Sequence, residues 1–393
     1  MFGRRTGNRS GTPAPGMGTI VLAVVPIVAA AILLGWGIVR EAVLPPIFKG
    51  SRIPTANPDA SFEARAVLGL LYEIGGRYTL SGQHNYLEAP GKHTARVRDL
   101  TGRVPAVIGF ELGAIMDYDK EDAHRYRIRV VEEAIRADRA GSLVVITYHA
   151  AFPGECECWE AVHTGVISGE TFAEIVTEGT RLHEEWLADI DEAAHYLKIL
   201  RDARVPVLWR PYHEMNGGWF WWGKKSRFAD LWNIMFDRYT RHHGLDNLLW
   251  VWNPNAPNAY ADPYDRYYPG HDKVDILAAD IYDNDYKQSH HDQLVKLGGG
   301  KPVAIGENGE LPNPGLLQTS QPGWTWFMTW GKMLRENNRD NTIRAVYAHP
   351  YVLTRDEIDP RPFPEPAEPE EPAEPGPVEP EEPGGPEEPG EPP

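Results

Sequence analysis

The sequence contains little cysteine: Cys156 and Cys158 are the only two among 393 residues. A disulfide framework needs several pairs and a structural zinc site needs four ligands, so this pair supports neither class of protein. One residue separates the two cysteines, and they therefore form either a strained local disulfide or two free thiols. We expect no catalytic role for either one.

The chain also lacks a basic surface for nucleic acid. Its formal net charge is −17, but residues 362–393 hold eleven glutamates and no basic residue, so the remainder carries only −6. Without a basic stripe we expect no nucleic-acid partner. Residues 359–393 are rich in proline and glutamate and poor in apolar side chains, which predicts a disordered, solvated tail.

Charged residues are missing from positions 18–39, a run of 22 residues. A transmembrane helix needs about 20, whereas the apolar part of a cleaved signal peptide has about 7–15. The run therefore favours an uncleaved signal-anchor over a signal peptide. Arginines precede the run, which places the N-terminus inside the cell. The main body would lie at the extracellular face of the membrane, or be secreted if the segment is cleaved. The predicted divisions are a basic cytoplasmic segment (1–16), a transmembrane helix (17–40), a linker (41–59), a catalytic domain (60–358) and the tail (359–393).

Within residues 60–358, apolar runs alternate with amphipathic stretches. Helix-like segments include Ala123–Arg139 and Ile175–Arg204. Eight alternating units predict an α/β fold of the closed (β/α)8 TIM-barrel type. An open doubly wound sheet would show a glycine-rich phosphate turn after its first strand, and none is present. The eight predicted strands are Tyr78–His84, Pro105–Leu112, Leu143–His149, Val205–Glu214, Leu248–Pro254, Val274–Tyr282, Pro302–Asn308 and Trp324–Trp330.

The most informative stretch is 207–223, in which a short apolar run ends in His213-Glu214 and is followed by glycines and aromatic residues. Active sites of α/β barrels collect at the carboxyl ends of the strands. A zinc-protease H-E-x-x-H motif would need a second histidine at position 217, which is glycine. The tryptophans could be core residues, but their glycine neighbours and the charged strand end favour a platform for sugar rings.

This stretch resembles glycoside hydrolase family 26 through Trp209-Arg210-Pro211-Tyr212-His213-Glu214 and Trp219-Phe220-Trp221-Trp222-Gly223. The resemblance covers roughly residues 60–358. It implies a retaining TIM-barrel glycosidase that uses two glutamates and no cofactor. Glu214 falls on the acid/base, at the end of the fourth strand. The segment 302–309 supplies Glu307 as the nucleophile, at the end of the seventh.

The resemblance also implies sugar contacts for several side chains. Arg210 is expected to pair with Glu307 and keep it ionised, since an opposite charge favours the charged form. His213 is either an orienting or substrate-binding group or a structural histidine, and Tyr282 is either a contact of the nucleophile region or structural. The stretch 148–153 reads Tyr-His-Ala-Ala-Phe-Pro, whereas the family motif usually reads Trp-His followed by Asn-Pro. Position 331 also departs from the family pattern, because it is glycine where many mannanases carry a polar residue. His84 and Glu111 end strands without an assigned role. The remaining predicted sugar contacts are His149, Asp280, Trp219, Trp330 and Trp159.

Together these features predict a monomeric endo-β-1,4-mannanase that cleaves mannan, glucomannan or galactomannan and needs no metal. A β-1,3-1,4-glucanase or β-1,3-xylanase on the same scaffold is the alternative within the enzyme class. The alternative outside it is a non-catalytic protein that binds cell-wall polysaccharide. Such a protein would be expected to lack one of the two carboxylates, and both are present.

Overall fold

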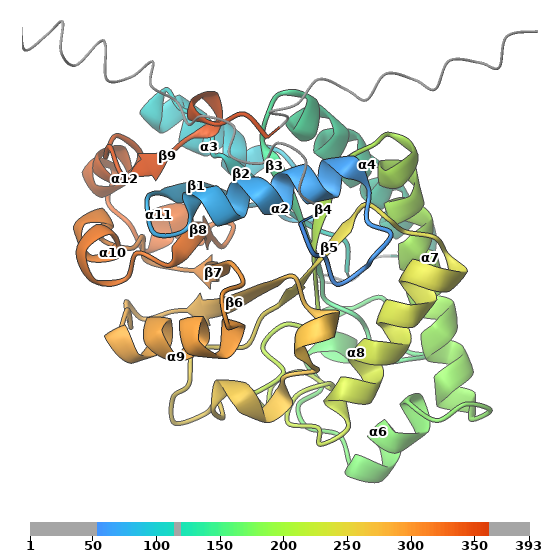
Figure 1. The fold of residues 1–393 in the computed structure, drawn as a ribbon. Helices are drawn as coiled ribbons and strands as arrows, with labels where there is room; N and C mark the ends of the chain where they lie inside the picture. Colours follow the sequence, from blue (N-terminus) through green and yellow to red (C-terminus); the bar gives the residue numbers. More distant parts are fainter. Residues whose placement is uncertain (1–52, 114–118, 361–393) are drawn as a thin grey trace, which may run out of the picture. The chain divides into compact units, whose positions relative to one another are not determined.

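The computed structural model describes residues 53–113 and 119–360. Eight parallel strands follow one another around a sheet that closes because β2 pairs with β1, and the predicted barrel is therefore confirmed (Figure 1). All eight predicted strands are present, with ends that differ by a few residues. The strands are β1 Thr79–His84, β2 Val107–Glu111, β3 Leu143–Tyr148, β4 Val207–Pro211, β5 Leu248–Trp252, β6 Ile276–Ile281, β7 Val303–Asn308 and β8 Trp324–Thr329.

Helices lie around the outside of the strands (Figure 1). Two long ones begin at side-chain caps: Asp119 accepts a hydrogen bond from Asp122 N before α4, and Thr180 accepts one from His183 N before α7. Such caps satisfy backbone donors that the first turn leaves unpaired. The α-helices are α2 Phe62–Ile74, α3 Lys92–Thr101, α4 Lys120–Arg139, α5 Trp159–Val162, α6 Gly169–Ile175, α7 Arg181–Asp202, α8 Phe228–Asp237, α9 Gln288–Gly298, α10 Pro314–Ser320, α11 Met333–Glu336 and α12 Asp340–Tyr347.

The continuous helix predicted from 175 to 204 is wrong. Residue 175 ends α6, and α7 begins only at residue 181. Gly179 lies between them with φ of 84°, a left-handed conformation that interrupts a right-handed helix. Thr180 then caps the new helix, so two neighbouring residues explain the break.

A short ninth strand, β9 Val352–Leu353, was not predicted. It pairs with Thr79 and Leu80 at the start of β1, while β2 pairs with residues 82–84 at the end of the same strand. The pair is too short to show a periodic pattern in the sequence. It extends the sheet at the amino end of β1, away from the carboxyl ends that carry the site.

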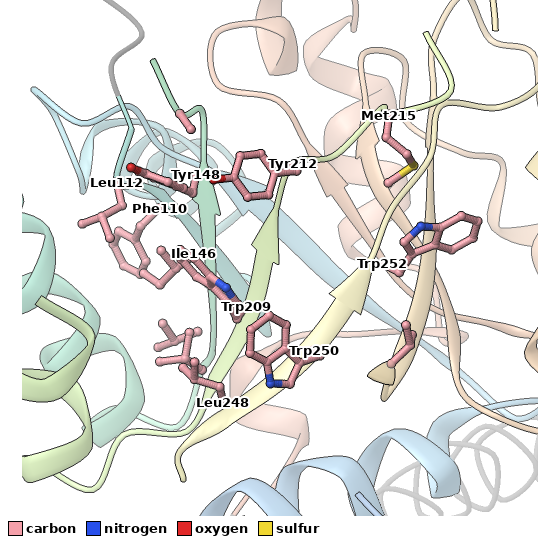
Figure 2. Packing of buried hydrophobic residues seen from close by; sticks show 14 of the residues in the cluster. Phe110, Leu112, Ile146, Tyr148, Trp209, Tyr212, Met215, Leu248, Trp250 and Trp252 are labelled. Atoms are coloured by element: carbon pink, nitrogen blue, oxygen red, sulfur yellow. The ribbon is translucent and has the colours of Figure 1, made fainter. Parts of the chain in front are cut away.

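The eight barrel strands are buried along their whole length, as expected for parallel strands covered on both faces. Figure 2 shows Trp209 and Trp250 among the packed side chains of this core. Trp209 packs on Tyr239 and Trp250 on Trp232, both from the surrounding helical layer. Trp209 therefore faces the helices. Because successive side chains of a strand point to opposite faces, the next residue, Arg210, points into the barrel.

The folded body begins earlier than the predicted boundary at residue 60. Ile53 is buried, and its carbonyl accepts a hydrogen bond from Arg65 Nη1 at 2.7 Å. Ala56 N donates to Asp275 Oδ1 at 2.6 Å. Residues 53–59, placed in a linker because of their prolines, therefore pack against the barrel.

The predicted N-terminal anchor and almost all of the Pro/Glu tail lie outside the described residues, and both stay predictions. Within residues 53–113 and 119–360, no helix has the length and hydrophobicity needed to cross a bilayer. The choice left open for the two cysteines is decided in favour of a disulfide between Cys156 and Cys158.

Candidate active site

The turn after β4 brings Glu214 into the mouth of the barrel. The strand ends at Pro211, and both Tyr212 (φ 48°) and Glu214 (φ 56°) adopt left-handed backbone conformations. Such conformations are uncommon for residues with a side chain and persist where the surroundings enforce them. Here Glu214 N donates to Asn253 O at 2.7 Å, and Gly217 N donates to Glu214 O at 2.9 Å.

Two side chains hold the carboxylate of Glu214. Trp219 Nε1 donates to its Oε2 at 2.6 Å, and Asn255 Nδ2 donates to its Oε1 at 3.1 Å. The indole of Trp219 reaches back over the turn because position 217 is glycine. A Cβ at Gly217 would lie 2.2 Å from the Trp219 ring. The glycine therefore allows the close approach that orients Glu214.

Glu307, the penultimate residue of β7, receives a different set of partners. Arg210 Nη2 forms an ion pair and hydrogen bond with its Oε1, and Tyr282 OH donates to its Oε2 at 2.5 Å. His213 Nε2 lies 3.8 Å from Oε1. Arg210 is fully buried, so the ion pair is little screened by water. Arg210 and Tyr282 thus contact one oxygen each of the Glu307 carboxyl group.

The electrostatic environment of Glu214 differs from that of Glu307. Burial, followed by repulsion from the negative charge of Glu307, raises the pKa of Glu214, and the two hydrogen bonds and Arg210 oppose this only in part. Burial and Glu307 also raise the pKa of Tyr282, which therefore remains a hydrogen-bond donor. The two carboxyls thus have different surroundings: the pKa of Glu214 is raised, and Glu307 is paired with a guanidinium, an asymmetry of the kind that acid/base and nucleophilic roles require.

Comparison with known proteins agrees with this geometry. The sequence profile of glycosyl hydrolase family 26 matches residues 56–357. The chain belongs to glycosyl hydrolase family 26.

Three similar proteins show how close the relationship to known proteins is. A mannan endo-1,4-beta-mannosidase from Thermothelomyces thermophilus is 38% identical over 317 residues, 77% of this chain and 62% of the relative. The chain thus spans about three fifths of that relative's length. The structure of GH26A from Muricauda sp. MAR_2010_75 matches with a TM-score of 0.73 and 40% identity, covering 77% of this chain and 99% of that one. The GH26-CBM35 beta-(1,4)-mannanase of Podospora anserina matches with a TM-score of 0.68 and 34% identity, covering 81% and 71%.

Asp280 joins the charged groups of this family 26 site. Arg210 Nη1 lies 3.3 Å from Asp280 Oδ2 and 3.1 Å from Asn253 Oδ1. Burial, followed by repulsion from Glu307, raises the pKa of Asp280, while Arg210 opposes the rise. The ladder between β6 and β7 shifts register between Ala279 and Asp280, which sets Asp280 opposite Glu307. One guanidinium therefore connects Asp280 with Glu307.

One group in the described part of the chain has the composition of a metal site. Ligand atoms of His213, Glu214 and Asp280 lie within 4.8 Å of one another. The positive charge at this point is already supplied by Arg210, which contacts Asp280 and Glu307.

Two histidines stand beside the carboxylates. His213 is buried, and its pKa is lowered by burial and then by Arg210, so its ring is neutral. The ring of His149 lies edge-on to that of His213 at 4.4 Å. Glu111 holds His149 in place: its Oε2 lies 2.7 Å from His149 Nδ1, and its Oε1 accepts from His149 N at 3.1 Å. Glu111 was left without a role because nothing in the sequence links it to residue 149.

The aromatic block after Glu214 divides into two parts. Trp221 and Trp222 are fully buried, and their N–H groups donate to Ala150 O and His213 O. They belong to the core, so a sugar platform on the whole block is wrong. Trp219, in contrast, is partly exposed beside Glu214. It is the member of the block that can meet a substrate.

The other two predicted platforms lie around His149. The ring of Trp330, which follows β8, is 5.6 Å from that of His149 and stacks on His84 at 4.1 Å. Trp159 is 37% exposed, and its ring lies 5.9 Å from that of His149. The described site therefore brings together all ten residues that the sequence singled out. Asn255 joins them as a contact of Glu214 that the sequence did not reveal, because it lies on a loop whose course the pattern does not specify.

Proposed function

We propose that this chain is a retaining endo-β-1,4-mannanase that hydrolyses mannan, glucomannan or galactomannan by double displacement. The observation that carries the proposal is the opposite treatment of two neighbouring carboxyls at the ends of β4 and β7. The Arg210 ion pair and the Tyr282 hydrogen bond hold the Glu307 carboxyl group in place for attack. Burial and the charge of Glu307 support protonated Glu214.

In the first step, the Glu307 carboxylate attacks the anomeric carbon and forms a glycosyl ester. Glu214 gives its proton to the glycosidic oxygen, so the C–O bond breaks and the leaving sugar departs as an alcohol. Arg210 and Tyr282, both in contact with Glu307, orient its oxygens for this attack. The two glutamates together provide the paired carboxyls that retaining glycosidases use.

In the second step, water replaces the leaving sugar. Once Glu307 is an ester it no longer carries the charge that repels ionised Glu214, so the pKa of Glu214 falls. Glu214 can then accept a proton from the water while the water oxygen attacks the anomeric carbon. The ester bond breaks, Glu307 leaves as a carboxylate, and the product has the configuration of the substrate.

The similarity to a mannan endo-1,4-beta-mannosidase and to a beta-(1,4)-mannanase favours mannan over other β-glycans as the substrate. The partly exposed indoles of Trp219 and Trp330 supply apolar faces of the kind that sugar rings pack against. Mixed-linkage β-glucan and β-1,3-xylan would meet the same carboxylates. They remain outcomes of the test.

The test is product analysis with the purified protein on β-1,4-mannohexaose, a mixed-linkage β-glucan oligosaccharide and a β-1,3-xylan oligosaccharide. We expect internal cleavage of mannohexaose, with mannobiose and mannotriose among the early products. If either of the other two oligosaccharides is cleaved faster, that glycan and not mannan is the substrate. Binding of mannohexaose without turnover would overturn the enzyme assignment and favour a polysaccharide-binding protein.

The pH profile should respond to the hydrogen bond that Asn255 donates to Glu214. Only protonated Glu214 can act as the acid, so kcat/KM falls as pH rises through its pKa. The Asn255 N–H stabilises the ionised form, so Asn255→Ala raises the pKa of Glu214 and moves the alkaline limb of kcat/KM to higher pH. Trp219→Phe, which removes the other hydrogen bond, should move it in the same direction. A limb that stays in place or moves to lower pH in both variants would contradict this assignment.

A further inference from the structure

The turn after β1 places an unassigned tyrosine beside the candidate site. Tyr86 is partly buried, and its ring lies edge-on to that of Trp330 at 5.7 Å. Its hydroxyl accepts a hydrogen bond from Lys332 N at 3.2 Å. The phenol therefore spans the segment 330–332 that follows β8. Accepting this bond leaves the phenol O–H as a donor.

Gly331 and Tyr86 fit each other sterically. A Cβ at Gly331 would lie 2.2 Å from Tyr86 Cζ and 2.3 Å from its hydroxyl oxygen. Gly331 also has φ of 38°, which side-chain-bearing residues adopt only with strain. The space where a side chain at 331 would begin is thus filled by the phenol of Tyr86.

Hydrogen bonds and packing of its neighbours fix the position of Tyr86. Asn85 N and Nδ2 donate to Gly109 O, while Asn85 Oδ1 accepts from His93 N and Thr94 N at the start of α3. The neighbouring Leu87 is fully buried. On the other side, the ring of His93 lies edge-on to Tyr86 at 5.0 Å. Burial and then Lys92 lower the pKa of His93 to about 4, so this supporting ring is uncharged at neutral pH.

The strand order indicates which part of the substrate Tyr86 would meet. Trp219 follows β4 and holds the acid Glu214, which protonates the leaving sugar. Tyr86 and Trp330 follow β1 and β8, which lie across the barrel from β4 and β5. Trp330, whose ring Tyr86 contacts, donates its backbone N–H to Asn308 O at 2.9 Å, and Asn308 is the residue next to the nucleophile Glu307. The side opposite the leaving group is the side of the sugar that the enzyme retains.

We propose that Tyr86 is a substrate-contacting, specificity-determining residue, whose phenol forms the wall of the subsite for the sugar next to the cleaved unit on the retained side. This inference rests on the proposed glycosidase function. The aromatic ring offers a flat apolar surface, and the hydroxyl can donate to a hydroxyl of that second sugar. Gly331 serves the same subsite by leaving room for the phenol.

The test compares two aryl glycosides that differ by one sugar. A 2,4-dinitrophenyl β-mannoside fills the cleavage subsite, and the corresponding β-mannobioside also fills its retained-side neighbour. Tyr86→Ala should lower kcat/KM on the mannobioside by about 10-fold, chiefly through KM, and leave the mannoside within about twofold, as expected for loss of one pocket contact. Tyr86→Phe should lose only about threefold on the mannobioside, because it keeps the ring.

The outcomes separate this inference from the enzyme proposal. A wild-type protein that cleaves neither glycoside nor any oligosaccharide contradicts the proposed function itself. An active wild type with an unchanged mannobioside-to-mannoside ratio in Tyr86→Ala contradicts the subsite. Equal losses on both glycosides would show a general structural role and also overturn it. If the wild type prefers glucosides, the same ratio is measured with the aryl β-glucoside and β-cellobioside.

A double-mutant cycle checks the steric fit independently. Gly331→Ser in the wild-type background forces a Cβ into the phenol of Tyr86, so it should lower kcat/KM on the mannobioside by about 10-fold or more. In the Tyr86→Ala background the overlap is gone, and the same substitution should cost distinctly less. Strain from the positive φ is present in both backgrounds and cancels. Strictly additive losses would show that the two residues do not share a subsite.

Discussion

Glu307→Ala is expected to lower kcat on mannohexaose by about 10⁴-fold or more, because it removes the group that forms the covalent intermediate. Glu307→Gln, which has nearly the same shape, should be impaired to a similar extent since an amide does not attack the anomeric carbon. Steady-state kinetics on mannohexaose measure both losses. Glu310→Ala, three positions along the same segment and outside the proposed catalytic contacts, is the matched control and should stay within about twofold of wild type.

Azide distinguishes a lost nucleophile from a damaged site. In Glu307→Ala, azide can enter from the face that Glu307 occupied, while Glu214 still protonates the leaving group. With an aryl β-mannobioside we therefore expect restored turnover and an α-mannosyl azide product. Turnover above about a tenth of the wild-type rate without azide would show that Glu307 is not the nucleophile. In Glu307→Gln the buried Arg210 keeps only Asp280 as a counter-ion. The thermal unfolding temperature of this variant shows whether the protein tolerates that loss and still folds normally.

Glu214→Ala is expected to give the second large effect, and it should depend on the leaving group. Mannohexaose, whose leaving sugar needs a proton, should lose about 10³-fold in kcat/KM, in the range of general acid catalysis. With 2,4-dinitrophenyl β-mannobioside, the leaving group is dinitrophenolate, which departs without protonation, so the first step should remain fast. The ester on Glu307 then accumulates because no base activates water, and a burst of dinitrophenol should precede a slow steady state.

The second step of Glu214→Ala can also be rescued by azide, which needs no base. Azide now attacks the glycosyl ester from the face that the leaving group vacated, so the product should be a β-mannosyl azide. The two variants should thus give azides of opposite configuration. Equal losses on mannohexaose and on the activated glycoside would show that Glu214 does not donate the proton.

Residues with a strong local pattern were predictable from the sequence. Most barrel strands are short, buried and largely apolar, and Glu214 and Glu307 lie at the carboxyl ends of two of them, where active sites of such barrels collect. The charge argument also anticipated the contact between Arg210 on β4 and Glu307 on β7, which are both buried near the carboxyl ends of their strands. These features depend on periodicity and on strand order, which the sequence displays.

Features that depend on loop paths could not be predicted. The Glu111 contact with His149 joins residues from two strands, and Asn255 reaches Glu214 from a loop 41 positions away. Trp219 differs from the buried Trp221 only in how the chain turns after Glu214, which no composition reveals. The fit between Tyr86 and residue 331 likewise becomes visible only when β8 and β1 lie side by side.

The most direct test of the central claim, that Glu214 and Glu307 act as a pair on one sugar, is proton NMR of the first product formed from mannohexaose. The account predicts that the newly released reducing end appears first as the β-anomer and only later equilibrates to the α-anomer. Initial appearance of the α-anomer would mean a single displacement by water, and it would contradict Glu307 as a covalent nucleophile.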